Sequence, residues 1–300
     1  MGVRNSETTG YELDTTPLSS QIFGMTALTV LQRSNRDGFP KAGELIEITG
    51  AHALEATDRT ILNLLYQHAH NSGRMGVKDA EWVIPLGKLR PSRHESNDRI
   101  TACLDRLLKV IVNVPYVSED GEPRVLKTHL IDFVDLSIDQ SNPRATVRFG
   151  VPKNLQPVLA QSNRWGRIKA EVVCAMTSKY AIALYEMVQL RANLDRCIES
   201  FPIARFRDLL GVPPGAYDRG PDFVRFVINP ALLEMNGLSD VGVQIDLKRR
   251  HARAPVEDVV IAWWRKEGDE FRKAMRERDQ SKIGRMARLR GRVEAVSLPT

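Results

Sequence analysis

The sequence predicts an α+β fold: two tandem winged helix-turn-helix domains with a flexible N-terminal arm and a basic C-terminal tail. Two strongly periodic helical segments are each followed by a short extended segment, a short helix and a second long helix. Each of these series ends in alternating, strand-like segments around a turn. The two halves share this order of elements but few residues, which is typical of a repeated structural unit rather than a repeated sequence. We expect the arm, the first domain, the second domain and the tail to occupy residues 1–42, 43–155, 156–267 and 268–300.

The composition is that of an ordinary globular protein. Of 300 residues, 42% are hydrophobic and 27% are charged. No apolar run approaches the ~20 residues needed to cross a bilayer, and the N-terminal residues lack the apolar core of a signal peptide. The three cysteines form no CxxC pair, so we expect reduced, mostly buried thiols in a cytoplasmic protein. The formal net charge of +6 favours a polyanionic partner without establishing one.

The first domain is expected to follow an arm rich in Ser, Thr, Gly, Asn and Asp. Its first helix has apolar side chains at helical spacing and takes Thr57 or Asp58 as its N-cap. An extended segment and a short helix from about Pro85 come next. A second strong helix follows, and alternating segments then flank an acidic turn at Glu119–Gly121 before a last strand over residues 144–152. This order is that of a winged helix with the acidic hairpin as its wing.

The second domain is expected to show the same order. Its first helix begins at Thr177 or Ser178, and Gly211 ends the short helix that comes after the next strand. A turn then precedes a long helix over residues 222–236. Two alternating strands within residues 241–266 surround a basic loop, which takes the place of the wing.

Pro230 lies in the middle of the long helix of the second domain. A proline there removes one backbone donor and crowds the carbonyl of Phe226, at a cost of about 3 kcal/mol in a helix interior. We expect Pro230 to divide a polar front of the helix from an apolar rear that packs on the domain. A kink at this point would let the front turn toward a partner.

Charged side chains gather at the front of this long helix. In a helix-turn-helix, the first residues of the recognition helix meet base edges in the major groove. Arginine binds guanine through two hydrogen bonds, and aspartate accepts one from cytosine N4. The same side chains also fit an ordinary helix with a capping aspartate and exposed arginines. The candidate residues are Arg219, Asp222 and Arg225.

The basic loop favours the interpretation as a DNA interface. Like charges this close need an anionic partner or full solvation, and a winged helix places its wing beside the phosphate backbone. We therefore expect double-stranded DNA to be a partner. The candidate wing residues are Lys248, Arg249, Arg250, His251 and Arg253.

A fainter version of this pattern occurs in the first domain, around the start of its second strong helix. The acidic hairpin turn is unfavourable beside phosphates, so we expect this domain to bind DNA less or to make protein contacts as well. Its candidate DNA-binding residues are Arg90, Ser92, Arg93, Asn97 and Arg99.

The tail, from about Glu267, is rich in arginine and lysine and poor in apolar residues. We expect a solvated helix or a disordered extension. Two interpretations stay open: the tail strengthens phosphate contacts, or it is simply solvated.

Enzymatic alternatives find little support in the residues. His68 and His70 match the His-hydrophobic-His pattern of rolling-circle nicking enzymes, with Tyr180 as a candidate nucleophile. However, side chains two apart on a helix diverge by about 200° and do not hold one metal ion. We expect Tyr180 and Tyr185 to be core residues. No P-loop, HExxH, paired CxxC or GxSxG motif is present. We expect no catalytic residue, no metal site and no cofactor.

The second half contains a set of short motifs: Ser178-Lys179-Tyr180-Ala181, Leu210-Gly211-Val212, Tyr217, Asp222-Phe223 and Pro230. These motifs resemble those of the replication initiator (Rep) proteins of iteron-containing plasmids. The match covers about residues 170–265, and over residues 45–155 it rests on the order of elements alone.

This resemblance implies a non-catalytic protein whose two winged-helix domains bind repeated origin sites, or iterons, and help to open the origin. It implies recruitment of the host's own initiator and helicase, and a monomer–dimer equilibrium in which dimers repress the initiator's own gene. It also implies that Arg219, Asp222 and Arg225 contact bases or phosphates. One departure from the family is that a single Arg225, between Val224 and Phe226, replaces consecutive basic residues. The alternatives are a tandem winged-helix transcriptional regulator and the nicking enzyme.

Overall fold

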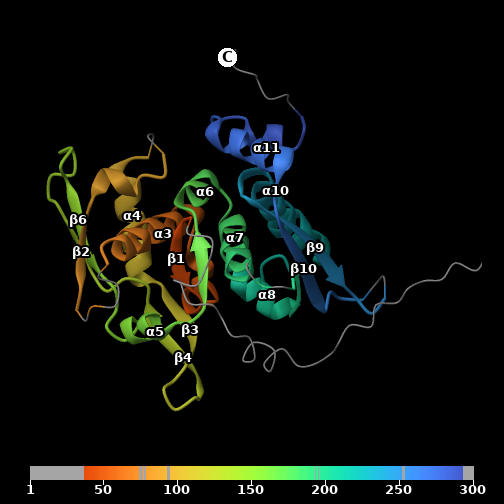
Figure 1. The fold of residues 1–300 in the computed structure, drawn as a ribbon, viewed down its shortest axis with the longest axis horizontal. Coiled ribbons are helices and arrows are strands. Elements are labelled where there is room, and N and C mark those ends of the chain that lie inside the picture. The colour runs from red at the N-terminus through yellow and green to blue at the C-terminus, as the bar shows by residue number, and fades with distance from the viewer. Residues whose placement is uncertain are drawn as a thin grey trace, which may run out of the picture.

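A computed structural model describes residues 37–73, 77, 79–92, 95–192, 194, 196–251 and 254–292 (Figure 1). In chain order the first elements are β1 (Phe39–Ala42), α2 (Gly43–Ile46), η2 (Ala51–Ala53), α3 (Ala56–Asn71), β2 (Glu81–Pro85), η3 (Leu86–Leu89), α4 (Asn97–Lys109), β3 (Ile111–Val117), β4 (Pro123–His129), β5 (Val134–Leu136), β6 (Thr146–Gly150), α5 (Gln156–Gln161), β7 (Trp165–Ile168) and α6 (Ala170–Ala175). The later elements are α7 (Lys179–Arg191), β8 (Ile198–Pro202), α8 (Ile203–Leu210), α9 (Gly220–Phe223), η4 (Val224–Ile228), α10 (Asn229–Leu238), β9 (Val241–Lys248), β10 (Asp258–Arg265), α11 (Gly268–Asp279) and α12 (Arg285–Leu289).

Two antiparallel sheets with the same strand order confirm the tandem winged-helix prediction. One sheet has the order β2-β6-β5 and the other the order β8-β10-β9, so in each the last strand in sequence lies in the middle. Phe149 on β6 pairs with Trp82 and Val134, as Val259 on β10 pairs with Phe201 and Leu247. The helices α3, η3 and α4 precede β5 and β6 as α7, α8 and the α9-η4-α10 helix precede β9 and β10.

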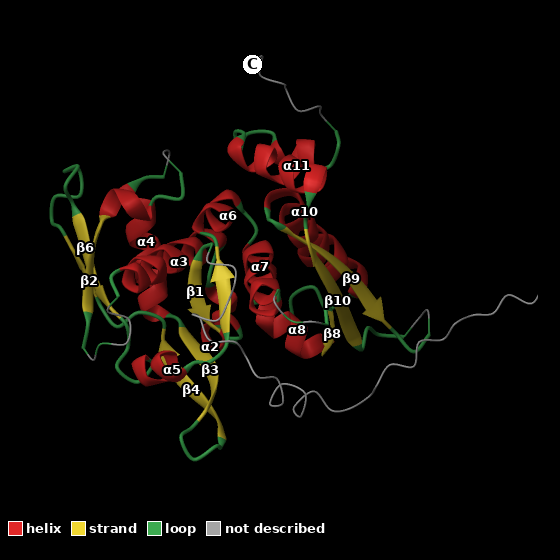
Figure 2. Cartoon of the chain, viewed as in Figure 1, coloured by secondary structure: helices red, strands yellow, loops and turns green. Residues whose placement is uncertain are grey.

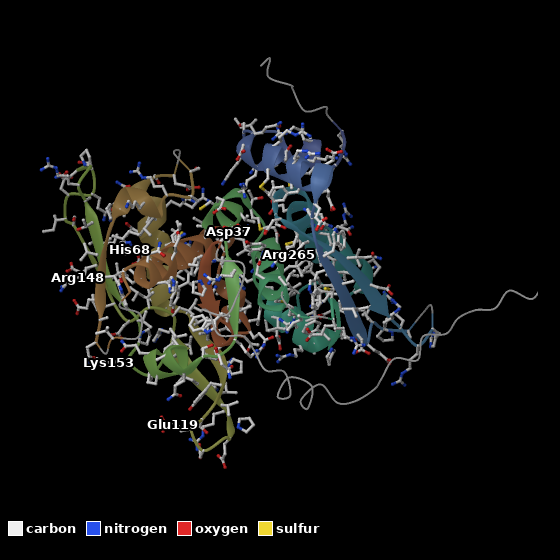
Figure 3. All side chains as sticks on the ribbon, in the orientation of Figure 1. Asp37, His68, Glu119, Arg148, Lys153 and Arg265 are labelled. Atoms are coloured by element: carbon white, nitrogen blue, oxygen red, sulfur yellow. The ribbon has the colours of Figure 1, made fainter. Side chains whose placement is uncertain are left out.

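The acidic hairpin is not the wing of the first domain, so that expectation was wrong. Strands β3 and β4 pair with each other as a separate two-stranded sheet, inserted between α4 and β5. Figure 2 shows this hairpin projecting from the body of the domain, and Figure 3 labels Glu119 at its far end. The wing is instead the turn between β5 and β6, residues 137–145. Alternation along the chain predicts strands but does not predict which strands pair.

Part of the expected arm belongs to the fold. Strand β1 pairs antiparallel with β7, with Phe39 opposite Ile168. The side chain of Phe39 is buried, and the Lys41 ammonium forms a buried ion pair with Glu186 on α7 at 2.8 Å. Apolar burial and this ion pair hold residues 39–42 in place, whereas residues 1–36 lie outside the described residues.

The central helix α7 joins the two domains. Residues Tyr180–Arg191 are buried, and Figure 1 shows α7 between the two sheets. A helix buried on all sides is surrounded by protein, and its buried charged groups Glu186 and Arg191 are each paired with an opposite charge. Tyr180 and Tyr185 are core residues, as expected.

An ion cluster lies where α7 meets the first domain. The guanidinium group of Arg191 contacts Glu47 at 2.5 Å and Glu199 on β8 at 2.5 Å, so it bridges the two domains. Arg164 and Arg205 also approach Glu47, at 3.2 Å and 3.8 Å. Burial acts to raise the pKa of Glu47, but the three guanidinium groups outweigh it and lower the pKa to about 2.

The described part of the tail includes a largely exposed helix, α11, as expected, but α11 and α12 also pack on the domain, which the prediction did not include. Helices α11 and α12 pack beside α10 and α6. The buried Arg285 donates to the Ala175 carbonyl at 2.9 Å, and Arg288 pairs with Glu277 at 2.7 Å. Arg285 and Arg288 thus serve as structural donors to carbonyls and one carboxylate, whereas Lys273, Arg276 and Arg290 are exposed. Residues 293–300 lie outside the described residues.

Local signals were predicted with mixed success. Ser178 caps α7 by accepting from the Ala181 amide, and Gly211 ends α8 in a left-handed conformation with φ of 72°. The N-cap of α3 is Glu55 rather than Thr57 or Asp58, because Asp58 instead accepts from the Glu55 amide in a capping box. All three cysteines are free thiols; Cys103 is buried, Cys174 is half-buried and Cys197 is exposed, so the expected burial is wrong for Cys197.

Candidate nucleic-acid interface

The recognition helix of the second domain runs without interruption through α9, η4 and α10. Its inner face buries apolar side chains such as Phe223, Val227, Ala231 and Met235. Its outer face is formed by residues at helical spacing that point away from the core. Of these, Asp222 is half-buried, and Arg225, Phe226 and Asn229 are exposed.

A π-helical turn accommodates Pro230. In η4 the Asn229 amide donates to the Val224 carbonyl, five residues back, in place of the usual four. Pro230, at the second position of α10, has no amide to donate to Phe226 and follows this wider turn directly. π turns of this kind often occur at functional sites. The turn holds one extra residue and therefore changes which side chains reach the outer face.

The predicted residues at the helix front lie together. The Arg219 guanidinium approaches the Asp222 carboxylate at 3.8 Å, and the Arg219 side chain is 81% exposed. The guanidinium group of Arg225 lies over the ring of Phe226, 5.2 Å from its centroid. Both arginines therefore present their donors to solvent at the start of the helix.

The wing of the second domain meets the front of the recognition helix. Arg249 donates to the Ala254 carbonyl at 2.8 Å and lies so close to Gly220 that a Cβ there would be 2.7 Å from its Nη2 atom. Lys248 pairs with Asp246 at 2.7 Å, and Arg250 with Glu257 at 2.6 Å. Such exposed pairs are worth about 0–1 kcal/mol, so phosphates can replace the carboxylates. His251 is exposed, and Arg253 lies outside the described residues.

A cleft of about 390 Å³ separates α8 from the wing and the helix front. Arg207 lines it and donates to the Tyr217 carbonyl at 3.0 Å, while its guanidinium lies 4.9 Å from the centroid of the Phe223 ring. Sequence reasoning did not single out Arg207. It fixes the turn between the two helices of the motif.

The predicted residues of the first domain contact other residues of the same chain. Arg90 donates to Asn97 at 2.6 Å, and Asn97 donates to the Gln140 carbonyl in the β5–β6 turn at 2.5 Å. Arg99 contacts Glu95 at 3.3 Å and the Thr57 hydroxyl at 3.3 Å.

Of the other two predicted residues of this domain, Ser92 is half-buried and Arg93 lies outside the described residues. Among the predicted residues that the structure describes, Arg90 and Arg99 of the first domain each bond to another side chain, whereas Arg225 of the second domain contacts only the ring of Phe226.

The histidines of the nicking-enzyme pattern lie on α3, as expected. The Nε2 atom of His68 is 2.8 Å from the Val83 carbonyl, and burial lowers the pKa of His70. Within the described residues, no group of three or more His, Cys, Asp or Glu side chains is arranged to hold a metal ion. The described helices include none that is long and apolar enough to span a membrane.

Two family models match this chain. The model for the first winged helix of initiator replication proteins matches residues 41–189, and the model for the second winged helix of initiator Rep proteins matches residues 202–263. The chain belongs to the initiator replication protein family. The resemblance inferred from the second-domain motifs is therefore confirmed. The two matches leave residues 190–201 between them, and the expected division at residues 155 and 156 stays a prediction.

One solved structure resembles the fold, and a second matches part of the chain only weakly. The crystal structure of Pi initiator protein in complex with iteron DNA superposes with a TM-score of 0.56 at 13% identity, covering 76% of this chain and 97% of that chain. The WH1 domain of MSBI1.176, a replication protein isolated from a multiple sclerosis patient, covers 39% of this chain and 88% of its own, at 10% identity and a TM-score of 0.29. No curated protein sequence matches the chain significantly.

Proposed function

We propose that this initiator replication protein binds repeated sites in double-stranded origin DNA, helps to open the origin and recruits the host's initiator and helicase, without catalysing a reaction. The observation that carries the proposal is the exposed outer face of the second recognition helix beside a basic wing. Membership of the initiator family supports the step from DNA binding to replication.

The geometry suits the major groove. A helix whose front carries Arg219 and Arg225 presents two forked donor groups to base edges, and guanine is the base that accepts two hydrogen bonds from one guanidinium. Lys248 and Arg250, on the adjacent wing, are positioned for the flanking phosphates. Base contacts supply sequence preference, and wing contacts supply affinity that falls with salt.

The Pi initiator protein was crystallised in complex with iteron DNA, which supports iterons as the DNA class here. We extend the proposal to repression of the protein's own gene by a dimer, in line with the family resemblance. A tandem winged-helix transcriptional regulator would use the same face on DNA, and it differs in not supporting replication.

Footprinting on the DNA flanking the coding region tests the proposal. We expect protection of tandem repeats. Arg225→Ala should need a higher protein concentration for the same protection, and Arg276→Ala, at an exposed arginine on α11, serves as the matched control and should not. A plasmid without its own replicon, supplied with this gene and the flanking DNA, should then replicate. Protection without replication would favour the regulator, and no protection would refute the proposal.

A further inference from the structure

An exposed aromatic ring occupies the DNA-facing side of the recognition helix. Phe226 is 45% exposed and lies directly after Arg225 on the outer face. The family resemblance leads one to expect a basic residue here. Phenylalanine provides neither charge nor a hydrogen bond, so it cannot take over a phosphate or guanine contact.

The ring of Phe226 contacts two neighbouring side chains. The ring of Tyr217 stacks on it with centroids 5.5 Å apart and planes 29° apart, and the Arg225 guanidinium lies 5.2 Å from its centroid. Contacts with both neighbours restrict the rotamers of this exposed side chain, so less conformational entropy is lost when it binds a ligand.

Tyr217 is itself fixed by the turn. Its backbone is in the left-handed region, with φ of 57°, and its carbonyl accepts from Arg207 at 3.0 Å. Arg207 is held over the ring of Phe223 on the buried face of the same helix. A series of contacts thus connects the buried ring of Phe223 through Arg207 and Tyr217 to the exposed ring of Phe226. These contacts fix the position of the Phe226 ring, as expected for a ring that binds a ligand.

The apolar group that a major groove offers is the C5-methyl group of thymine, and phenylalanine is among the residues that contact it. We propose that Phe226 reads a thymine methyl group next to the base contacted by Arg225. This inference rests on the proposed function. It adds a preference for thymine, which follows from having phenylalanine where the family resemblance leads one to expect a basic residue.

Single-methyl changes in the DNA test this inference. A pool of random duplexes is first enriched for binding to the full chain. Each thymine of the enriched site is then replaced in turn by deoxyuridine, which lacks only the methyl group. Wild type should lose about threefold to fivefold in affinity at one thymine, the amount expected for one buried methyl group.

Variants assign the effect to the ring. Phe226→Ala should bind thymine and deoxyuridine equally at that position, whereas Phe271→Ala, at a 38% exposed phenylalanine on α11, should discriminate as wild type does. Thermal unfolding checks that both variants fold. If Phe226→Ala does not fold, the deoxyuridine scan with wild type still tests the inference.

The outcomes separate this inference from the proposed function. Enrichment of no sequence refutes the proposed function and this inference together. An enriched site at which no deoxyuridine weakens binding, or at which Phe226→Ala still discriminates, refutes this inference and leaves the proposed function standing.

Discussion

The two winged-helix domains share a strand order and differ in what the fronts of their recognition helices contact. In the first domain, Asn97 donates to the wing turn and Arg99 contacts Glu95 and Thr57. In the second domain, Arg219 and Arg225 extend from the helix into solvent. In both domains the wing touches the front of the recognition helix, but only in the second does the described front carry an arginine, Arg225, that contacts no polar side chain of the domain.

The two recognition helices are also anchored differently. On α4, Arg106 donates to the buried Asp58 near the start of α3, at 2.8 Å and 2.9 Å. On α10, the buried Glu234 accepts from the Thr177 and Ser178 amides before α7, both at 2.9 Å. In the first domain an arginine of the recognition helix is used for anchoring. In the second domain the carboxylate of Glu234 anchors the recognition helix, so no arginine of that helix is needed for anchoring.

The largest expected effect concerns the junction that holds the two domains together. Glu47→Ala leaves Arg191 buried without one of its carboxylates and should cost about 3–5 kcal/mol of unfolding free energy. Glu122→Ala, which removes an exposed carboxylate from the β3–β4 hairpin, is the matched control and should change stability little. Denaturant unfolding measures both, and equal effects would contradict a structural role for the junction.

The same carboxyl predicts a pH dependence. The pKa of Glu47 is lowered from 4.5 to about 2 in the folded chain, so its contribution is present above pH 4.5 and is lost as pH falls toward 2. The shift corresponds to about 3 kcal/mol. Wild type should therefore lose more stability over this range than Glu47→Gln. Parallel loss in the two proteins would show that the ion cluster does not stabilise the junction.

The next effect compares the helix fronts. Arg225→Ala should weaken specific DNA binding by about 1–3 kcal/mol, because it removes a base contact. Arg99→Ala should change affinity less than tenfold, since its guanidinium already contacts Glu95 and Thr57. Titration of labelled duplex measures both. A larger loss for Arg99→Ala would reverse the roles assigned to the two domains.

A smaller effect compares the wings. Arg250→Ala should reduce the slope of log affinity against log salt by about one, the amount expected for one phosphate contact, and should weaken binding evenly across sequences. Arg144→Ala, at an exposed arginine in the β5–β6 turn, should leave the slope near that of wild type. Equal slopes for wild type and Arg250→Ala would show that Arg250 in the second wing does not contact a phosphate.

The smallest effect concerns Pro230. Pro230→Ala restores an amide that can donate to Phe226 and removes the reason for the π turn. Stability should change by about 1 kcal/mol or less. DNA affinity should fall, because Arg225 and Phe226 change their direction on the outer face. Unchanged affinity would mean that the π turn does not position the reading residues.

Local patterns in the sequence predicted the helices, the second wing and the front of the second recognition helix. Period and capping residues determine these features within a few neighbouring positions, as at Ser178 and Gly211. Pairing across long separations was not predictable in this way. The pairing of β1 with β7 and the inserted β3–β4 hairpin depend on contacts that no local spacing reveals.

The candidate site was predicted in part, for a related reason. Arg225 stands out by charge, whereas Phe226 and Asn229 needed the helical spacing from Asp222 to be followed around the outer face. For the basic residues of the tail, the sequence left phosphate contacts and simple solvation open, and neither interpretation included burial in the fold. Arg285 is buried against backbone carbonyls that only the folded chain brings together.

Methylation of guanine N7 by dimethyl sulfate tests most directly whether the second domain reads bases. Arginine contacts guanine at O6 and N7, so bound protein should protect the guanine that Arg225 contacts in each site. That protection should vanish with Arg225→Ala and persist with Arg99→Ala, at concentrations where each variant saturates the DNA. Protection of the same guanines by both variants would contradict the assignment of base reading to the second recognition helix.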